Sequence, residues 1–212
     1  MSIKEEMTNL KEIVIKMADA VVLNMSEAIN FYLNKDTTIT NINDDLIDQY
    51  ERLIEEICLN ILLKERPFAK DLKEVTGVLK LVSDIERLGD HAEDIFEFSQ
   101  KLRNFENEKN DDIVELCDYV LKMVKDSINS FIHDDINLAN EIILADEYVD
   151  KKYIEIIENL TKTNKNDQNY LHFLIYTTLV VKYLERIADH AVNVAEWCVY
   201  MRSGFYKDRN LF

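Results

Sequence analysis

The chain has 212 residues with 41 acidic and 25 basic side chains, which give a formal net charge of −16. A field this negative repels nucleic acid and anionic lipid, so we expect no nucleic-acid partner and regard cations as the natural small partners. Three glycines and one proline leave few turn residues for β-hairpins, which favours long helices. The composition therefore predicts an all-α fold, and the length suits one domain or two compact halves.

The sequence also disfavours a secreted or membrane-spanning protein and a protein stabilised by disulfides. The N-terminal segment MSIKEEMTNL has no apolar signal core, and the most apolar run, Phe173 to Val181, is too short to span a bilayer. Cys58, Cys117 and Cys198 are odd in number, far apart and in no CxxC pair. We therefore expect a cytoplasmic protein whose cysteines are small core residues.

Six long windows show apolar residues at every third or fourth position, the pattern of one helical face. In the third window this face consists of Val75, Val78, Val82, Ile85, Gly89, Ala92 and Phe96. Short polar breaks separate the windows near residues 34–38, 65–67, 104–111, 133–136 and 163–169. Because short connections suit antiparallel neighbours, the sequence predicts six long antiparallel helices.

Two acidic segments each occur twice in the chain. Residues 86–92, ERLGDHA, reappear 99 positions later as ERIADHA at 185–191, with five of seven residues identical. Residues 44–48, DDLID, correspond to DEYVD at 146–150, a shift of 102. Two repeated segments in the same order indicate duplication of a three-helix unit. We predict two tandem three-helix bundles, residues 1–106 and residues 107–212.

Each repeated segment holds two carboxylates four residues apart, a spacing that puts both on one helical face. The pairs are Asp44 with Asp48, Glu86 with Asp90, Asp146 with Asp150, and Glu185 with Asp189. Like charges so placed destabilise a helix by roughly 0.2 to 0.5 kcal/mol, and a bound cation reverses that effect. The simpler interpretation is that these acids are solvated surface residues.

The position of the last pair favours metal binding. Glu185 lies on an apolar stripe of its helix, and a carboxylate on a packing face needs a partner. The four acidic pairs outnumber the nearby bases, chiefly Arg87, Arg186 and Lys182. Two helices that each present such a pair can gather four to eight oxygens, which suits Mg²⁺, Ca²⁺ or Mn²⁺, and which iron and zinc also accept. We predict that all eight carboxylates are metal ligands.

Histidine and arginine recur beside the acids. His91 and His190 each follow an aspartate, but one residue turns a side chain about 100° around the helix. Whether they assist the ligands or are ordinary polar positions stays open. Arg87 and Arg186 are expected to pair with an acid on the adjacent helix. A phosphate-contacting role has less support, because no glycine-rich phosphate loop is present.

With these residues set out, the chain resembles the PhoU family over nearly its whole length. The ERxxD core of that family is present at residues 86–90 and again at 185–189. Residues 67–73, PFAKDLK, resemble its Pro-x-Ala-x-Asp-Leu-Arg segment, and residues 44–48 and 146–150 resemble its D-x-x-I/V-D segments. The second repeat departs from the first, since it lacks the proline-led entry. Whether the two halves bind the same number of metal ions therefore stays open.

The resemblance implies a fold, a site and a role. The fold is two three-helix bundles, each binding an iron or zinc cluster, or magnesium or manganese, through E/DxxxD motifs. The implied ligands are Glu86, Asp90, Glu185 and Asp189, with Asp44, Asp48, Asp146 and Asp150 opposite. The implied role is negative regulation of phosphate uptake and of the phosphate-starvation response. The implied partners are a phosphate ABC transporter and its sensor histidine kinase. Binding to them would hold the protein at the inner face of the membrane. Whether the protein forms a homodimer stays open.

Two other classes remain as alternatives. A ferritin-like di-iron carboxylate protein is also acidic and helical, but its Glu-x-x-His signature is missing, because no histidine here has an acid three residues before it. A metal-free helical adaptor would leave the acidic pairs solvated. No nucleophile motif is recognisable, so we do not expect an enzyme.

Overall fold

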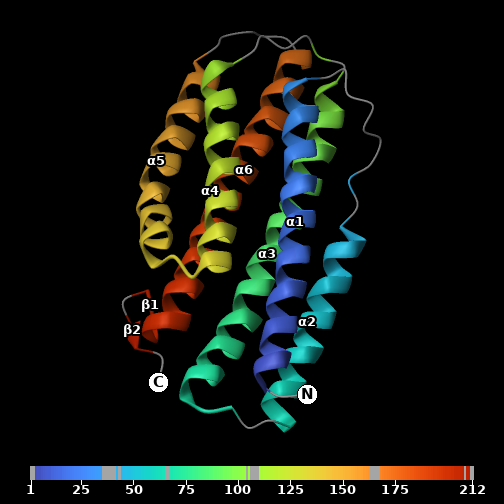
Figure 1. Ribbon diagram of the computed structural model, residues 1–212. Coiled ribbons are helices and arrows are strands. Elements are labelled where there is room, and N and C mark those ends of the chain that lie inside the picture. Colours follow the sequence, from blue (N-terminus) through green and yellow to red (C-terminus); the bar gives the residue numbers. More distant parts are fainter. Residues whose placement is uncertain are drawn as a thin grey trace.

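The computed structural model describes residues 3–34, 42, 44–64, 67–103, 105, 110–162, 168–207 and 209–210. Across these residues the chain forms six α-helices: α1 (Ile3–Leu33), α2 (Asp45–Lys64), α3 (Ala69–Leu102), α4 (Asp111–His133), α5 (Ile136–Thr161) and α6 (Gln168–Ser203). Successive helices run in opposite directions (Figure 1). The expected all-α fold of six long antiparallel helices is therefore confirmed.

The helices form two groups of three. In Figure 1, α2 lies on one outer side of the molecule and α5 on the other, while α3 and α6 cross near the centre. The α3–α6 contact is the most extensive between any two helices, and α1 also touches α4. The two groups therefore share a long interface. The expected boundary between residues 106 and 107 falls outside the described residues, after α3 ends and before α4 begins.

The helix ends follow the polar breaks of the sequence. Between α4 and α5 only Asp134 and Asp135 are non-helical. Asp134 takes a left-handed conformation with φ of 54°, which aspartate tolerates better than most residues. The side chain of Asp135 then accepts hydrogen bonds from the backbone N–H groups of Asn137 and Leu138, at 3.0 and 3.1 Å. Two adjacent aspartates thus end one helix and cap the next.

A short hairpin follows α6. Gly204, with φ of 85°, ends the helix, and its N–H donates to the carbonyl of Tyr200 over 2.7 Å. Strand β1 (Phe205–Tyr206) then pairs antiparallel with β2 (Arg209–Asn210). The hairpin, which helical periodicity does not predict, packs on the end of α6 (Figure 1).

The core consists of the apolar stripes that the periodicity indicated. The expected face of α3, from Val75 to Phe96, is buried at each of its positions. Cys58, Cys117 and Cys198 are buried free thiols, as expected of small core residues. A Cβ atom added to Gly89 would come within 2.9 Å of Ile47 Cδ1, so glycine allows α2 to approach α3 closely.

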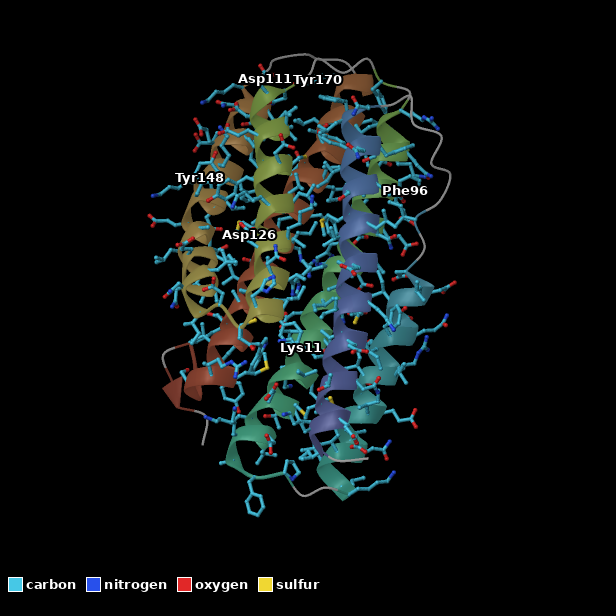
Figure 2. The ribbon with its side chains drawn as sticks, viewed as in Figure 1. Lys11, Phe96, Asp111, Asp126, Tyr148 and Tyr170 are labelled. Atoms are coloured by element: carbon cyan, nitrogen blue, oxygen red, sulfur yellow. The ribbon has the colours of Figure 1, made fainter. Side chains whose placement is uncertain are left out.

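Side chains fill the space between the helices (Figure 2). Asp111 at the start of α4 and Tyr170 near the start of α6 lie at the same end of the molecule. The Tyr170 hydroxyl donates to the carbonyl of Leu160 on α5, over 3.5 Å, which links two helices at that end. Among the described residues, no helix combines the length and apolarity needed to cross a bilayer.

Candidate functional site

The first group of acids lies between α2 and α3. Asp44 immediately precedes α2 and Asp48 lies on its first turn, while Glu86 and Asp90 lie on successive turns of α3. The carboxyl group of Asp44, just before α2, lies close enough to Asp90 on α3 to form a hydrogen bond when one of the two is protonated. Burial raises the pKa of Asp44, and the negative charges of Asp48 and Asp90 raise it further. Helix packing therefore brings the two predicted pairs of this repeat together.

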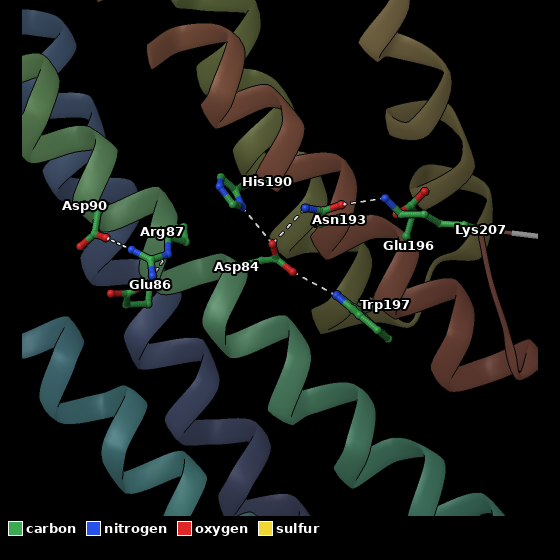
Figure 3. A network of polar contacts seen from close by, with 9 residues as sticks. All are labelled: Asp84, Glu86, Arg87, Asp90, His190, Asn193, Glu196, Trp197 and Lys207. Carbon is green, nitrogen blue, oxygen red and sulfur yellow. Dashed lines mark hydrogen bonds and ion pairs between the residues drawn. The ribbon is translucent and has the colours of Figure 1, made fainter. Parts of the chain in front are cut away.

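Glu86 is the most perturbed acid of this group. Its side chain is 16% exposed, and burial together with the charge of Asp90 raises its pKa to about 7. The Arg87 guanidinium lowers that pKa only in part. Arg87 pairs with Asp90 at 2.7 Å and with Glu86 at 3.5 Å, all on α3 (Figure 3). Among the described residues, the ion pairs of Arg87 thus lie within its own helix, while its charge also acts on Glu51 of the adjacent α2.

Two further acids join this group that sequence reasoning missed. Burial and the charges of Glu55 and Asp48 raise the pKa of Glu51 on α2. Burial and the charges of Asp44 and Glu97 raise the pKa of Glu93 on α3. Neither acid recurs in the second repeat, where tyrosine and valine stand at the matching positions 153 and 192. A search for repeated acids could not find them, although Glu51 lies one helical turn after Asp48.

The second group of acids lies between α5 and α6. Burial and the charges of Asp150, Asp189 and Glu185 raise the pKa of Asp146 to about 6. The four predicted carboxylates of this repeat are therefore also close enough to repel one another. Asp150 and Asp189 are exposed, so solvent reaches this group more readily than the first.

A lysine already occupies part of the second group. Lys182 Nζ lies 2.5 Å from Glu185 Oε2, and it also lies over the ring of Tyr153, 5.2 Å from its centroid. The matching position in the first repeat is Ser83. The two acidic groups therefore differ in the basic side chain that pairs with them, which is Arg87 in the first group and Lys182 in the second.

The donor chemistry of both groups fits a hard cation, because every donor is a carboxylate oxygen. The raised pKa values of Glu86 and Asp146 reflect burial and a mutual repulsion that a cation would relieve. In the part of the chain that the structure describes, no three histidine, cysteine, aspartate or glutamate side chains are already arranged to hold a metal ion.

A separate polar cluster joins the two repeats at the α3–α6 interface. Asp84 on α3 accepts hydrogen bonds from three side chains of α6 (Figure 3). The donors are Asn193 Nδ2 and Trp197 Nε1, each at 3.0 Å, and His190 Nδ1, at 2.9 Å. Asp84 was not singled out from sequence, because the matching residue of the second repeat is Tyr183 and not an acid.

The C-terminal hairpin adds to this cluster. The ring of Tyr206 stacks on Trp197, with centroids 3.9 Å apart and planes inclined by 17°. Lys207 Nζ lies 3.4 Å from Asn193 Oδ1 and 3.3 Å from Glu196 Oε2. The hairpin is thereby attached to the same face of α6 that binds Asp84.

His91 and His190 meet at this interface. Their ring centroids are 5.4 Å apart, and Tyr183 lies beside His91 with centroids 5.1 Å apart. Burial and the positive charge of Arg186 lower the pKa of His91 to about 4, so its ring is neutral at neutral pH. Both histidines point toward the neighbouring helix.

The fold and the site thus define a duplicated six-helix protein with one acidic group in each half. The family model described as PhoU domain matches residues 14–99 and 113–198, once in each half. A PhoU homolog of Clostridium acetobutylicum, named a phosphate-specific transport system accessory protein, is 31% identical over 199 residues. The match covers 92% of this chain and 90% of the homolog. A Pseudomonas aeruginosa protein with the same name is 29% identical, over 94% of this chain and 84% of its own length.

Solved structures agree with these matches. The crystal structure of PhoU from Pseudomonas aeruginosa superposes with a TM-score of 0.89 at 27% identity, over 96% of this chain and all of that one. The phosphate transport system regulatory protein PhoU from Streptococcus pneumoniae has the same fold, with a TM-score of 0.74 over 98% of this chain and 96% of its own; the two are 23% identical. The chain belongs to the PhoU family. It is an accessory, regulatory type of protein and not an enzyme.

Proposed function

We propose that this chain is a negative regulator of phosphate uptake and of the phosphate-starvation response. It would act in the cytoplasm, at the inner face of the membrane, by binding a phosphate ABC transporter, its sensor histidine kinase, or both. The PhoU match over both halves carries this proposal, because the matched relatives are named accessory proteins of a phosphate-specific transport system.

We also propose that metal ions bind the two acidic groups. The ligands would be Asp44, Asp48, Glu86 and Asp90 in the first repeat, and Asp146, Asp150, Glu185 and Asp189 in the second. The support is that each set lies across two packed helices, where like charges and burial raise carboxyl pKa values. Oxygen donors favour Mg²⁺ or Mn²⁺ and also accept iron or zinc. A bound cation would reduce the negative charge of the surface that meets a partner.

The regulatory proposal is tested by complementation. A bacterial host that lacks its own PhoU protein would receive this chain, and phosphate uptake and a phosphate-starvation reporter would be measured in high phosphate. We expect the chain to restore repression of both. Unchanged reporter activity, from a chain that is shown to be expressed and folded, would contradict the proposal. Pull-down from the same cells identifies whether transporter or kinase is bound, and sedimentation decides between monomer and homodimer.

The metal proposal needs a separate test on purified protein. Elemental analysis of protein prepared without chelator would be compared with the E86Q/D90N variant and with the control variant E56Q/D126N. Glu56 is exposed on α2, and Asp126 on α4 pairs with Lys122. We expect metal in the wild type and control and less in E86Q/D90N. Equal metal content in all three would show that Glu86 and Asp90 are not ligands, and no metal in any of them would favour the metal-free adaptor.

A further inference from the structure

The two repeats place one histidine each at their common interface. His91 on α3 and His190 on α6 are 99 positions apart, and their ring centroids lie 5.4 Å apart with planes inclined by 47°. They face the α3–α6 contact and not the acidic groups beside which they stand in sequence. The pair is therefore a chemical feature distinct from the carboxylate groups.

Each imidazole is held by a carboxylate through Nδ1. His190 Nδ1 lies 2.9 Å from Asp84 Oδ1, and His91 Nδ1 lies 3.3 Å from Asp94 Oδ2. When Nδ1–H donates to a carboxylate, the lone pair of a neutral ring is on Nε2. Metal-binding histidines almost always donate their other ring N–H to a carboxylate, a backbone carbonyl or water, which fixes the ring and makes the free nitrogen more basic.

The free nitrogen of His91 lacks a partner. His91 is 4% exposed, and its buried Nε2 has no hydrogen-bond partner within the described residues. Buried polar atoms of native proteins are nearly always paired, with protein, with water or with an ion. A group outside the described residues therefore belongs next to this nitrogen.

We infer that His91 and His190 together bind a transition-metal ion, such as Zn²⁺, Ni²⁺ or Cu²⁺, through their Nε2 atoms between the two repeats. Two imidazoles that share a tetrahedral ion at metal–nitrogen distances of about 2.0 to 2.1 Å have ring centres about 5 Å apart, close to the separation found here. Imidazole suits these metals, whereas the carboxylate groups suit harder cations.

The surroundings set the strength of this site. Asp84 and Asp94 contribute one negative charge to each ring, while Arg186, whose charge acts on His91, opposes a further cation. The His190 side chain is 19% exposed, so water can reach the pair and complete the coordination. Two protein ligands make a weaker site than the usual three or four. The ion would join α3 to α6 and so act on the relative position of the repeats.

The test uses the electron paramagnetic resonance of Cu²⁺, whose pulsed spectrum shows a nitrogen modulation from bound imidazole. The parent protein would be H133Q/H172Q, because His133 and His172 are exposed and are the other two histidines of the chain. With one equivalent of Cu²⁺ we expect the pattern of two imidazoles. Adding H190Q should remove that pattern and weaken Cu²⁺ binding at least tenfold. H190Q is preferred to a change at His91, which is more deeply buried, and circular dichroism checks its fold.

Two outcomes would overturn the inference: a parent that shows no imidazole modulation or the pattern of a single imidazole, or a Cu²⁺ affinity that H190Q leaves unchanged. A further variant, D44N/D48N/D146N/D150N on the same parent, separates this site from the proposed carboxylate sites. We expect it to lose Mn²⁺ binding while it keeps the two-imidazole pattern. If it loses the pattern, the histidines belong to the carboxylate sites and a separate site is excluded. If it keeps both Mn²⁺ binding and the pattern, the carboxylate proposal fails and this one stands.

Discussion

Asp84 on α3 accepts a hydrogen bond from the indole N–H of Trp197 on α6, over 3.0 Å. The contact between Asp84 and Asn193 has a repeat-related counterpart at the same interface. Tyr183 of α6 stands at the position that matches Asp84, and its hydroxyl donates to Asp94 of α3. At the place of Asp94 the second repeat has Asn193, which donates to Asp84. In both contacts the acid lies on α3 and the donor on α6, so the first repeat accepts both hydrogen bonds and the second repeat donates them.

Replacing Asp84 by alanine should destabilise the protein substantially. His190, Asn193 and Trp197 would each lose an acceptor in a partly buried setting, and an unpaired buried donor costs roughly 1 to 3 kcal/mol. Because water can reach part of the cluster, we expect a loss of about 2 to 4 kcal/mol in the free energy of unfolding. Urea denaturation, followed by the fluorescence of the single tryptophan, measures it.

The matched control is Asp126→Ala, since Asp126 pairs only one turn away with Lys122 on the surface of α4. An exposed pair of this kind is worth roughly 0.5 kcal/mol. Equal losses for D84A and D126A would show that the Asp84 cluster does not stabilise the interface.

A change of pH should act through Glu86. Its pKa is raised from 4.5 to about 7, so the folded state holds this proton more tightly than the unfolded state. The stability that the proton contributes is full below about pH 4.5 and is lost as the pH rises through about 7. In chelator, we therefore expect E86Q to gain stability relative to the wild type as the pH rises from 5 to 8.

The difference between E86Q and wild type is the informative quantity, because His91 acts in the opposite sense. Because the pKa of His91 is lowered in the folded state, the unfolded state binds a proton more readily. The contribution of His91 to the stability of the protein therefore falls as the pH drops toward about 4. Urea midpoints at pH 5, 6, 7 and 8 give the difference, with E56Q as the exposed control. A difference that does not change with pH would refute the raised pKa.

The contact between Gly89 and Ile47 should behave as a coupled pair. A Cβ on residue 89 would meet Ile47 Cδ1 at 2.9 Å, and the matching residues of the second repeat are Ala188 and Val149, both fully buried. Compared with the first repeat, the second repeat thus gains a methyl group at Ala188 on α6 and loses one at Val149 on α5. We expect Gly89→Ala to suffer overpacking and Gly89→Ala/Ile47→Val to recover, since alanine also favours helix by about 1 kcal/mol over glycine.

A double-mutant cycle measures this coupling from thermal or urea unfolding. We expect the double variant to be more stable than the sum of the two single changes by roughly 0.5 to 2 kcal/mol. Strict additivity would mean that the two positions do not constrain each other. Val75→Ala/Ile47→Val serves as a comparison in which no methyl group is exchanged between facing positions.

The helices and the acidic groups could be predicted from sequence because both leave a local, repeated signal. Apolar periodicity marks a helix within a single window, and a polar break marks its end. Asp44 with Asp48 could be linked to Glu86 with Asp90 because the same order of pairs recurs about 100 residues later. Duplication therefore supplied the long-range information that one segment lacks.

The α3–α6 cluster left no such signal. Asp84 is 106 to 113 positions from its three partners, and its repeat-related residue is a tyrosine. Glu51 joins the first acidic group without a counterpart in the second repeat. The choice of Arg87 between its own helix and the next depends on side-chain rotamers, which spacing does not fix. These features follow from packing, and only the folded chain reveals them.

Lys182 should weaken cation binding at the second acidic group, on the proposal that this group binds metal. Its ammonium lies against Glu185 and would have to withdraw before a divalent ion could bind that carboxylate. A partly exposed ion pair is worth about 0.5 to 1 kcal/mol, which corresponds to roughly a two- to fivefold change in affinity. In the E86Q/D90N background, which leaves the second group intact, Lys182→Met should therefore bind Mn²⁺ two- to fivefold more tightly by calorimetry. The control is Lys122→Met, which frees Asp126 on α4 and should leave the Mn²⁺ affinity unchanged. An equal gain in affinity in both variants would mean that net charge alone governs binding.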